Sequence, residues 1–394
     1  MPENQQEPSS AGAMRSPEAV RSYARRRYGL FIAHLVVGAG FLAAMVLGGS
    51  EVIGRQALDI AGPHRYLTRV FFYFTFFSLA YLVVTLPLTF YREYLLERRF
   101  GLSTQTPGRW ARRRVKKWVF SFVVAAPLVL IIYSTLRSWP GRWWLPASAV
   151  WVLLAFVLAK FAPQIFLPLF YKLERIDNRR LEDKLARLSE QAGLGLEGAY
   201  RIDLSRETRK ANAAVIGMGS TRRVVLGDTL LGGFSEDEIA VVFAHELGHI
   251  VLGHLAKGFA AFSVLIIVSL YLGSVVIHWA AAELGIEPVM VGQIENRVAN
   301  PETMPLLLAV LAVIQFLIMP FEKWYSRRRE RASDAYALRA TGDRAAFIGA
   351  MKKLASLNLA DVRPNKLAKL LLFSHPPILE RIRFAEQFDM EPSE

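Results

Sequence analysis

The chain has 394 residues, 53% of them hydrophobic, and a formal net charge of +14. So much apolar sequence, gathered in long blocks, excludes an ordinary soluble globular protein. Cysteine is absent, so disulfides and thiolate metal ligands are excluded, and a metal site must use His and carboxylate side chains.

Residues 1–20 are rich in Ser, Pro, Glu and Gln and are expected to form a disordered tail. Behind this tail, six apolar stretches are each long enough to cross about 30 Å of hydrocarbon. They are residues 29–48, 69–90, 118–136, 143–170, 258–281 and 304–321. Four of them form an N-terminal membrane part (21–170) and two more form a second one (258–321). The chain is therefore predicted to be a multi-pass membrane protein.

Charge alternates between the loops that join these stretches. Arginines gather at 21–27 and Arg and Lys fill residues 92–117, whereas the loop at 283–302 is mainly acidic. Lys and Arg collect on the cytoplasmic side of a membrane, here a cell inner membrane or ER membrane, so both termini are predicted to be cytoplasmic. The basic charge then sets topology and attracts anionic lipid, and no nucleic-acid partner is expected.

The polar segments are 171–257 and 322–394, and both are predicted to be cytoplasmic. An amphipathic helix is expected at 178–193, followed by strand-like runs at 198–204, 213–216 and 223–226. The Gly-rich connection between the last two runs favours a β-hairpin or a loose turn. Ser235 and Glu238 then form a capping-box pattern that begins another helix. After the sixth apolar stretch, a second polar helix is expected to begin at 321.

The capped helix carries the string His245-Glu246-Leu247-Gly248-His249, which matches the HExxH motif of zinc metalloproteases. Positions four apart share one helix face, so His245 and His249 can bind one metal ion. Glu246 can take a proton from water held by that ion. For a bare motif, the alternative is that the two histidines merely satisfy each other and a buried carboxylate.

A hydrolytic zinc site needs a third protein ligand and an open position for water. Two membrane crossings after His249, Glu330 returns to the same membrane face, and Asp334 follows one helical turn later. Glu330 can therefore be the third ligand, while Asp334 accepts the other ring N–H of a ligand histidine. The alternative is that Glu330 forms only surface salt bridges with the neighbouring arginines.

HELGHIVLGH (245–254), followed by Glu330 and Asp334, resembles the type I CAAX prenyl protease family of integral membrane zinc metallopeptidases. Further strings, in order over residues 70–385, resemble the same family. They are FYREY (90–94), RFGLSTQT (99–106), QIFLPLF (164–170), NA (212–213), DTLL (228–231) and SHPPILER (374–381). The fold class expected is mainly α, a multi-pass α-helical membrane bundle of about six crossings with a small α+β zincin-like metalloprotease domain at the cytoplasmic face. Family members are described with seven membrane helices around a water-filled chamber, so one helix fewer is expected here, before residue 70.

The resemblance also implies roles for individual residues. His245, His249 and Glu330 resemble the ligands of one Zn²⁺ per chain, Glu246 the catalytic base, and Asp334 the acid that orients a ligand. Asn212 and Ala213 resemble a substrate-binding strand that pairs with an extended peptide. His375 resembles a residue that holds the substrate or the transition-state oxyanion. Considered alone, Asn212 could be an ordinary turn residue and His375 a helix-boundary histidine, and His254 is expected to be structural.

The predicted activity is peptide hydrolysis by zinc-bound water that Glu246 activates. The implied substrate is a prenylated CAAX-type peptide or lipidated protein that loses its C-terminal residues. Membrane lipid is the other expected partner. The enzyme is expected to be monomeric. One alternative is a broader quality-control protease of the heat-shock membrane protease type, whose chains are shorter and lack the loop at 90–106. A catalytically idle scaffold is disfavoured because every catalytic residue is present.

Overall fold

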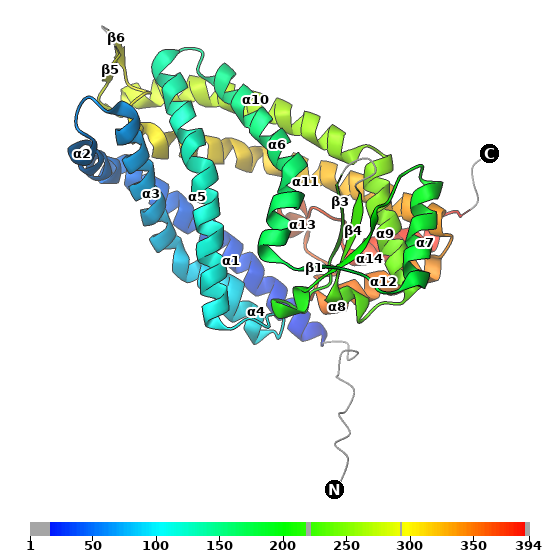
Figure 1. The fold of residues 1–394 in the computed structure, drawn as a ribbon. Helices are drawn as coiled ribbons and strands as arrows, with labels where there is room; N and C mark the ends of the chain where they lie inside the picture. The colour runs from blue at the N-terminus through cyan, green and yellow to red at the C-terminus, as the bar shows by residue number, and fades with distance from the viewer. Residues whose placement is uncertain (1–15, 218–221, 292–293, 391–394) are drawn as a thin grey trace.

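The computed structural model describes residues 16–217, 222–291 and 294–390. Residues 1–15 of the predicted tail lie outside the described residues, and the prediction is wrong for 17–20, which begin helix α1. Six helical spans of the described chain are long and apolar enough to cross a membrane, as predicted. Their main helices are α1 (Pro17–Ala44), α3 (Tyr66–Phe90), α5 (Pro107–Ser138), α6 (Trp144–Phe170), α10 (His254–Glu283) and α11 (Met304–Thr341). Figure 1 shows them as a splayed bundle, with a compact group of strands and shorter helices at one end.

The first span is bent. Helix α1 continues through a π-helical turn (Met45–Gly49) into α2 (Ser50–Ala61). Gly48 adopts φ 149°, a conformation that a residue with a Cβ rarely takes, so glycine permits the bend. Twelve residues of α-helix extend only about 18 Å, so α2 is too short to cross the hydrocarbon by itself. One crossing therefore precedes α3, in agreement with the six predicted.

Two short connections leave the membrane helices at opposite ends. After α3, a second π-helical turn (Tyr91–Leu95) and α4 (Leu96–Arg99) lead towards α5. Between α10 and α11, the hairpin of β5 (Val289–Val291) and β6 (Ile294–Asn296) lies at the far end from the compact group (Figure 1). This hairpin occupies the acidic loop that charge alternation assigns to the outer side.

A four-stranded sheet lies in the compact group, in the order β1-β2-β4-β3. Its strands are β1 (Leu173–Arg175), β2 (Gly198–Ile202), β3 (Ala213–Ile216) and β4 (Arg223–Gly227). Strands β2 and β4 are parallel, whereas β3 pairs antiparallel with β4, from Ala213 opposite Leu226 to Ile216 opposite Arg223. The predicted hairpin is confirmed, although residues 218–221 of its connection lie outside the described residues. Strand β3 is left as an edge strand of the sheet.

Helices that come before and after the second membrane part (258–321) in the sequence pack together with this sheet. They are α7 (Arg179–Gln191), α8 (Asp228–Leu231), α9 (Glu236–Val251), α12 (Arg344–Leu357) and α14 (Ile378–Gln387), whereas α13 (Lys366–Leu372) packs against α11. One hydrophobic core joins them: Leu185 of α7, Val224 of β4, Phe243 of α9 and Phe347 of α12 are all buried in it. Segments before and after α10 and α11 therefore fold as one unit.

The prediction that a separate polar helix begins at residue 321 is wrong. The sixth membrane helix and the polar helix are one continuous helix, α11, and the boundary placed at 321/322 falls inside it. Pro320 lies within α11, where membrane helices tolerate proline because neighbouring groups satisfy the freed carbonyl. Helix α11 thus carries side chains from the membrane directly into the compact group.

Candidate metal centre and active site

Helix α9 begins with the capping box that the sequence predicts. The Ser235 hydroxyl accepts from the Glu238 amide at 3.2 Å, and the Glu238 carboxylate accepts from the Ser235 amide at 2.7 Å. Ile239 and Phe243 then bury the inner face of the helix in the core. This packing fixes the rotation of α9, so that His245 and His249 face Glu330 of α11.

Gly248 allows α11 to approach α9 closely at this point. A Cβ on Gly248 would lie 3.1 Å from the Ser333 Cα and 3.2 Å from the Tyr336 side chain. Such contacts are tighter than ordinary van der Waals packing, so the glycine between the two histidines brings the helices together. Glu330, one turn before Ser333 on α11, thereby reaches the histidines of α9.

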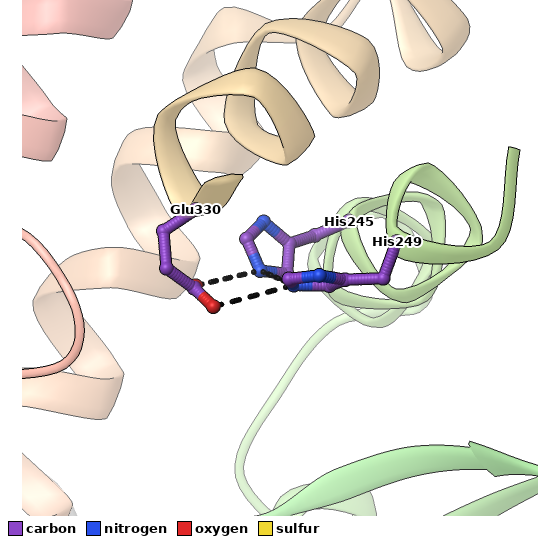
Figure 2. A group of neighbouring side chains, drawn as sticks. All are labelled: His245, His249 and Glu330. Atoms are coloured by element: carbon purple, nitrogen blue, oxygen red, sulfur yellow. Dashed lines mark hydrogen bonds and ion pairs between the residues drawn. The ribbon is translucent and has the colours of Figure 1, made fainter. Parts of the chain in front are cut away.

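The structure brings His245, His249 and Glu330 together, and Figure 2 shows their side chains converging between the two helices. The two Nε2 atoms lie 3.2 Å apart. The Glu330 carboxylate oxygens lie 3.2 Å from His245 Nε2 and 3.4 Å from His249 Nε2. Two ligands bonded to one tetrahedral zinc lie roughly 3.3 Å apart, so these three side chains fit zinc with little adjustment.

A buried chain of polar groups supports His245 from behind. Its Nδ1 lies 2.8 Å from Asp334 Oδ1, so an N–H there donates to the carboxylate and directs Nε2 towards the metal position. Asp334 in turn accepts from Arg381 on α14, whose Nε lies 2.8 Å from Oδ2 and whose Nη2 donates to Oδ1. Sequence reasoning gave Arg381 no role, and its only signal was its place at the end of the family-like string 374–381.

His249 has a support of its own. His254, the first residue of α10, places Nδ1 3.0 Å from His249 Nδ1 and 3.4 Å from the Ser333 hydroxyl. A left-handed Gly253 separates α9 from α10 and turns the chain so that this contact forms. His254 therefore lies outside the group of three ligands, and its ring positions the ring of His249.

Glu246 is only partly exposed, and it lies close enough to His245, His249 and Glu330 for their charges to act on its carboxyl group. Burial raises the pKa of its carboxyl group above the ordinary glutamate value, and the nearby Glu330 charge adds to the rise. A carboxylate with a raised pKa is a stronger base. The position and chemistry of Glu246 therefore suit proton transfer beside the metal site.

His375 comes from the segment between α13 and α14. Arg327 of α11 donates to the carbonyls of Lys369 and Phe373, at 2.9 and 2.8 Å, and holds this segment against α11. The His375 Nδ1 lies 2.6 Å from Glu330 Oε2, while 61% of the side chain is exposed. The ring is thus held beside the metal position with one side open to an incoming molecule.

Asn212 and Ala213 lie at the start of edge strand β3. Asn212 is exposed, and Ala213 and Val215 pack against the core that contains α9. Helix α9, which carries His245 and His249, packs against β3. Asn212 and Ala213 form the open strand edge that runs beside the motif helix.

The chain matches known families along almost its whole length. Residues 175–389 match peptidase family M48, and residues 15–172 match the family described as CAAX prenyl protease N-terminal, five membrane helices. In that range the described residues form four long helices and the shorter α2 and α4. His245, His249 and Glu330, which could hold a metal ion, fall in the first of these matches.

Similar proteins include both bacterial and eukaryotic members. The uncharacterized metalloprotease YhfN of Bacillus subtilis is 31% identical over 89% of this chain and 81% of its own. CAAX prenyl protease 1 of Saccharomyces cerevisiae is 25% identical over 76% of this chain and 68% of its own. The crystal structure of S. mikatae Ste24p shares the fold, with a TM-score of 0.78 and 21% identity over 96% of this chain and 90% of that one. The chain therefore belongs to peptidase family M48 and is a multi-pass membrane metalloprotease.

Proposed function

We propose that this protein is a zinc endopeptidase that removes C-terminal residues from prenylated CAAX-type peptides or proteins. The observation that carries the proposal is the convergence of His245, His249 and Glu330 at zinc-like separations, with Glu246 beside them. One zinc ion per chain is expected, because the described chain brings together a single such group.

Zinc, when bound, polarises the scissile carbonyl and makes a water molecule easier to deprotonate. Glu246 accepts the proton of the attacking water and passes it to the leaving amine. Asp334, held by Arg381, keeps His245 in the orientation that binds the metal. His375 donates from its open side to the oxygen on which negative charge develops.

The edge of β3 supplies the place for the peptide. An extended substrate would add a strand beside Asn212 and Ala213, so that main-chain hydrogen bonds hold the scissile bond next to α9. A lipid on the substrate would remain among the membrane helices, at the end of the bundle where the compact group lies (Figure 1). The prenyl group is favoured because the N-terminal membrane part matches the CAAX prenyl protease N-terminal family.

A comparison of two peptides tests the substrate. A farnesylated CAAX-type peptide and the same peptide without the lipid are incubated with the purified protein in detergent, and cleavage products are identified by mass. We expect cleavage on the C-terminal side of the farnesylated Cys and a much lower rate without the lipid. Equal rates on both peptides would contradict prenyl selectivity and favour the broader quality-control protease.

We also propose that both termini and the active site face the cytoplasm, in a cell inner membrane or ER membrane, and that the monomer is the active unit. The alternation of basic and acidic loops supports this orientation. Because the chain has no cysteine, Met290→Cys on the exposed hairpin β5–β6 gives a single labelling site. An impermeant thiol reagent should label it from outside intact cells, and labelling from the cytoplasmic side alone would contradict the topology.

A further inference from the structure

A cavity of about 750 Å³ opens beside the metal site. His375 and Arg381 line one end of it, and the wall is completed by Tyr23 and Arg27 of α1 and by Lys323 of α11. These parts of α1 and α11 flank the apolar stretches of two membrane helices. The cavity therefore joins the catalytic residues to the membrane boundary.

The start of strand β3 is tied to the wall of this cavity. The Ala211 amide donates to Asn358 Oδ1 at 3.1 Å, and the Lys210 ammonium donates to the Tyr23 hydroxyl at 3.0 Å. Tyr23 and Asn358 both line the cavity. A chain leaving the sheet at the Asn212 end of β3 would thus enter the cavity.

This connection sets the direction of a bound peptide. Antiparallel pairing is the commoner arrangement of neighbouring strands, and β3 already pairs in that way with β4. A peptide antiparallel to β3 ends at the Asn212 side, so its C-terminal residues lie in the cavity and its N-terminal residues lie towards Ile216. The leaving fragment of the substrate is then the part that the cavity holds.

The charges of the cavity favour a peptide end that carries a negative charge. Arg27, Arg92 and Lys323 line it, together with the acids Glu322 and Asp361. Both acids already accept hydrogen bonds: Glu322 from the Gln315 amide at 2.9 Å and Asp361 from the Tyr28 hydroxyl at 2.8 Å. The cations outnumber the acids, and Phe31, Met319 and Leu359 provide apolar wall between them.

We propose that this cavity binds the short C-terminal fragment of the substrate and that Arg27 and Lys323 bind its terminal α-carboxylate. The inference rests on the proposed peptidase function and makes its substrate class more specific. The protein cuts near a free C-terminus because the carboxylate is recognised a few residues beyond the scissile bond. Charge-assisted hydrogen bonds supply the recognition.

The test compares two forms of one farnesylated peptide that ends three residues after the modified Cys. One form has a free C-terminal carboxylate and the other a C-terminal amide, so they differ only in the group proposed to bind Arg27 and Lys323. With the wild-type protein, kcat/KM should be about tenfold or more higher for the acid. Equal kcat/KM values for acid and amide would overturn the inference and leave the peptidase function standing.

Variants assign the recognition to the cavity. In Arg27→Gln and Lys323→Gln the acid-to-amide ratio should fall towards one, mainly through KM for the acid, with zinc content unchanged. Arg112→Gln, in a separate basic surface near Lys172, is the matched control and should keep the wild-type ratio. A ratio that stays at the wild-type value in both cavity variants would overturn the assignment. Failure to cleave either peptide would instead overturn the proposed function itself.

Discussion

Helix α11 passes through two environments that treat side chains in opposite ways. In its membrane half, Val313 and Leu317 are 60% and 71% exposed, whereas in its polar half Ser333 and Asp334 are almost completely buried. Exposure of Val313 and Leu317 to lipid costs no free energy, because lipid tails are as apolar as these side chains. The second pair is buried only because each polar group has a partner. The membrane half anchors the helix in lipid, and the polar half carries Glu330 and Asp334 of the proposed metal site.

The two halves of α11 also pack in two different hydrophobic cores. The core of the compact group joins α7, α9, α12 and β4 around the motif helix. The core of the membrane part joins α3, α5, α10 and α11, with Tyr73, Tyr133 and Leu307 among its buried residues. Changes in the polar half of α11 should therefore affect metal binding and activity, whereas changes on its lipid-facing side should affect neither.

The largest effect is expected from Glu330→Ala, which removes the metal ligand that α11 contributes. Zinc should fall from about one per chain to a trace amount, and peptide cleavage should fall below about one-hundredth of wild type. Metal analysis of the purified protein and a cleavage assay measure both. Glu386→Ala, an exposed carboxylate on α14, is the control and should behave as wild type. Zinc retained at wild-type affinity would remove Glu330 from the ligand set.

A smaller effect is expected from Arg381→Met. The substitution leaves the buried Asp334 carboxylate without its guanidinium partner, so the support of His245 weakens. Zinc affinity should fall by about 10- to 100-fold, as measured by competition with a chelator, and the protein should unfold at a lower temperature. Arg383→Met is the matched control on the exposed side of the same helix. Unchanged zinc affinity in Arg381→Met would show that Asp334 does not need this partner.

The smallest effects come from a pair of leucines on α11. Leu338 is fully buried in the core of the compact group, and Leu338→Ala should lower the free energy of unfolding by about 2–5 kcal/mol. Leu317 faces outward, and Leu317→Ala should change it by about 0.5 kcal/mol or less. Unfolding in detergent, followed by circular dichroism, compares the two. Equal destabilisation would contradict the division of α11 into a lipid-facing half and a packed half.

The convergence of His245, His249 and Glu330 could be predicted because helix periodicity and membrane topology bring these residues together. His245 and His249 share one helix face by periodicity, and two membrane crossings return Glu330 to the same side. The six crossings and the β3–β4 hairpin could be predicted from apolar length and turn residues. These features depend on local sequence or on the membrane, so the amino-acid sequence alone is enough to predict them.

Other features depend on contacts between distant residues. Arg381 reaches Asp334 across 47 residues of sequence, and no local pattern indicates that an arginine on α14 supports the site. The continuity of α11 could not be predicted because the change from apolar to polar residues at 321 marks the end of the membrane stretch and leaves open whether the helix ends there. The packing of α2 against α3 after the bend at Gly48 is another contact that no local pattern indicates.

The most direct test of the account compares wild type with Glu246→Gln, which keeps the shape of the side chain and removes its basicity. Zinc content and cleavage of the farnesylated peptide are measured on the same preparations, with Glu190→Gln on α7 as an exposed control. The variant should retain about one zinc per chain and cleave at least about a hundredfold more slowly, because the proton acceptor is lost while the metal ligands remain. Undiminished cleavage by a zinc-loaded Glu246→Gln protein would contradict the assignment of Glu246 as the base and, with it, the proposed mechanism.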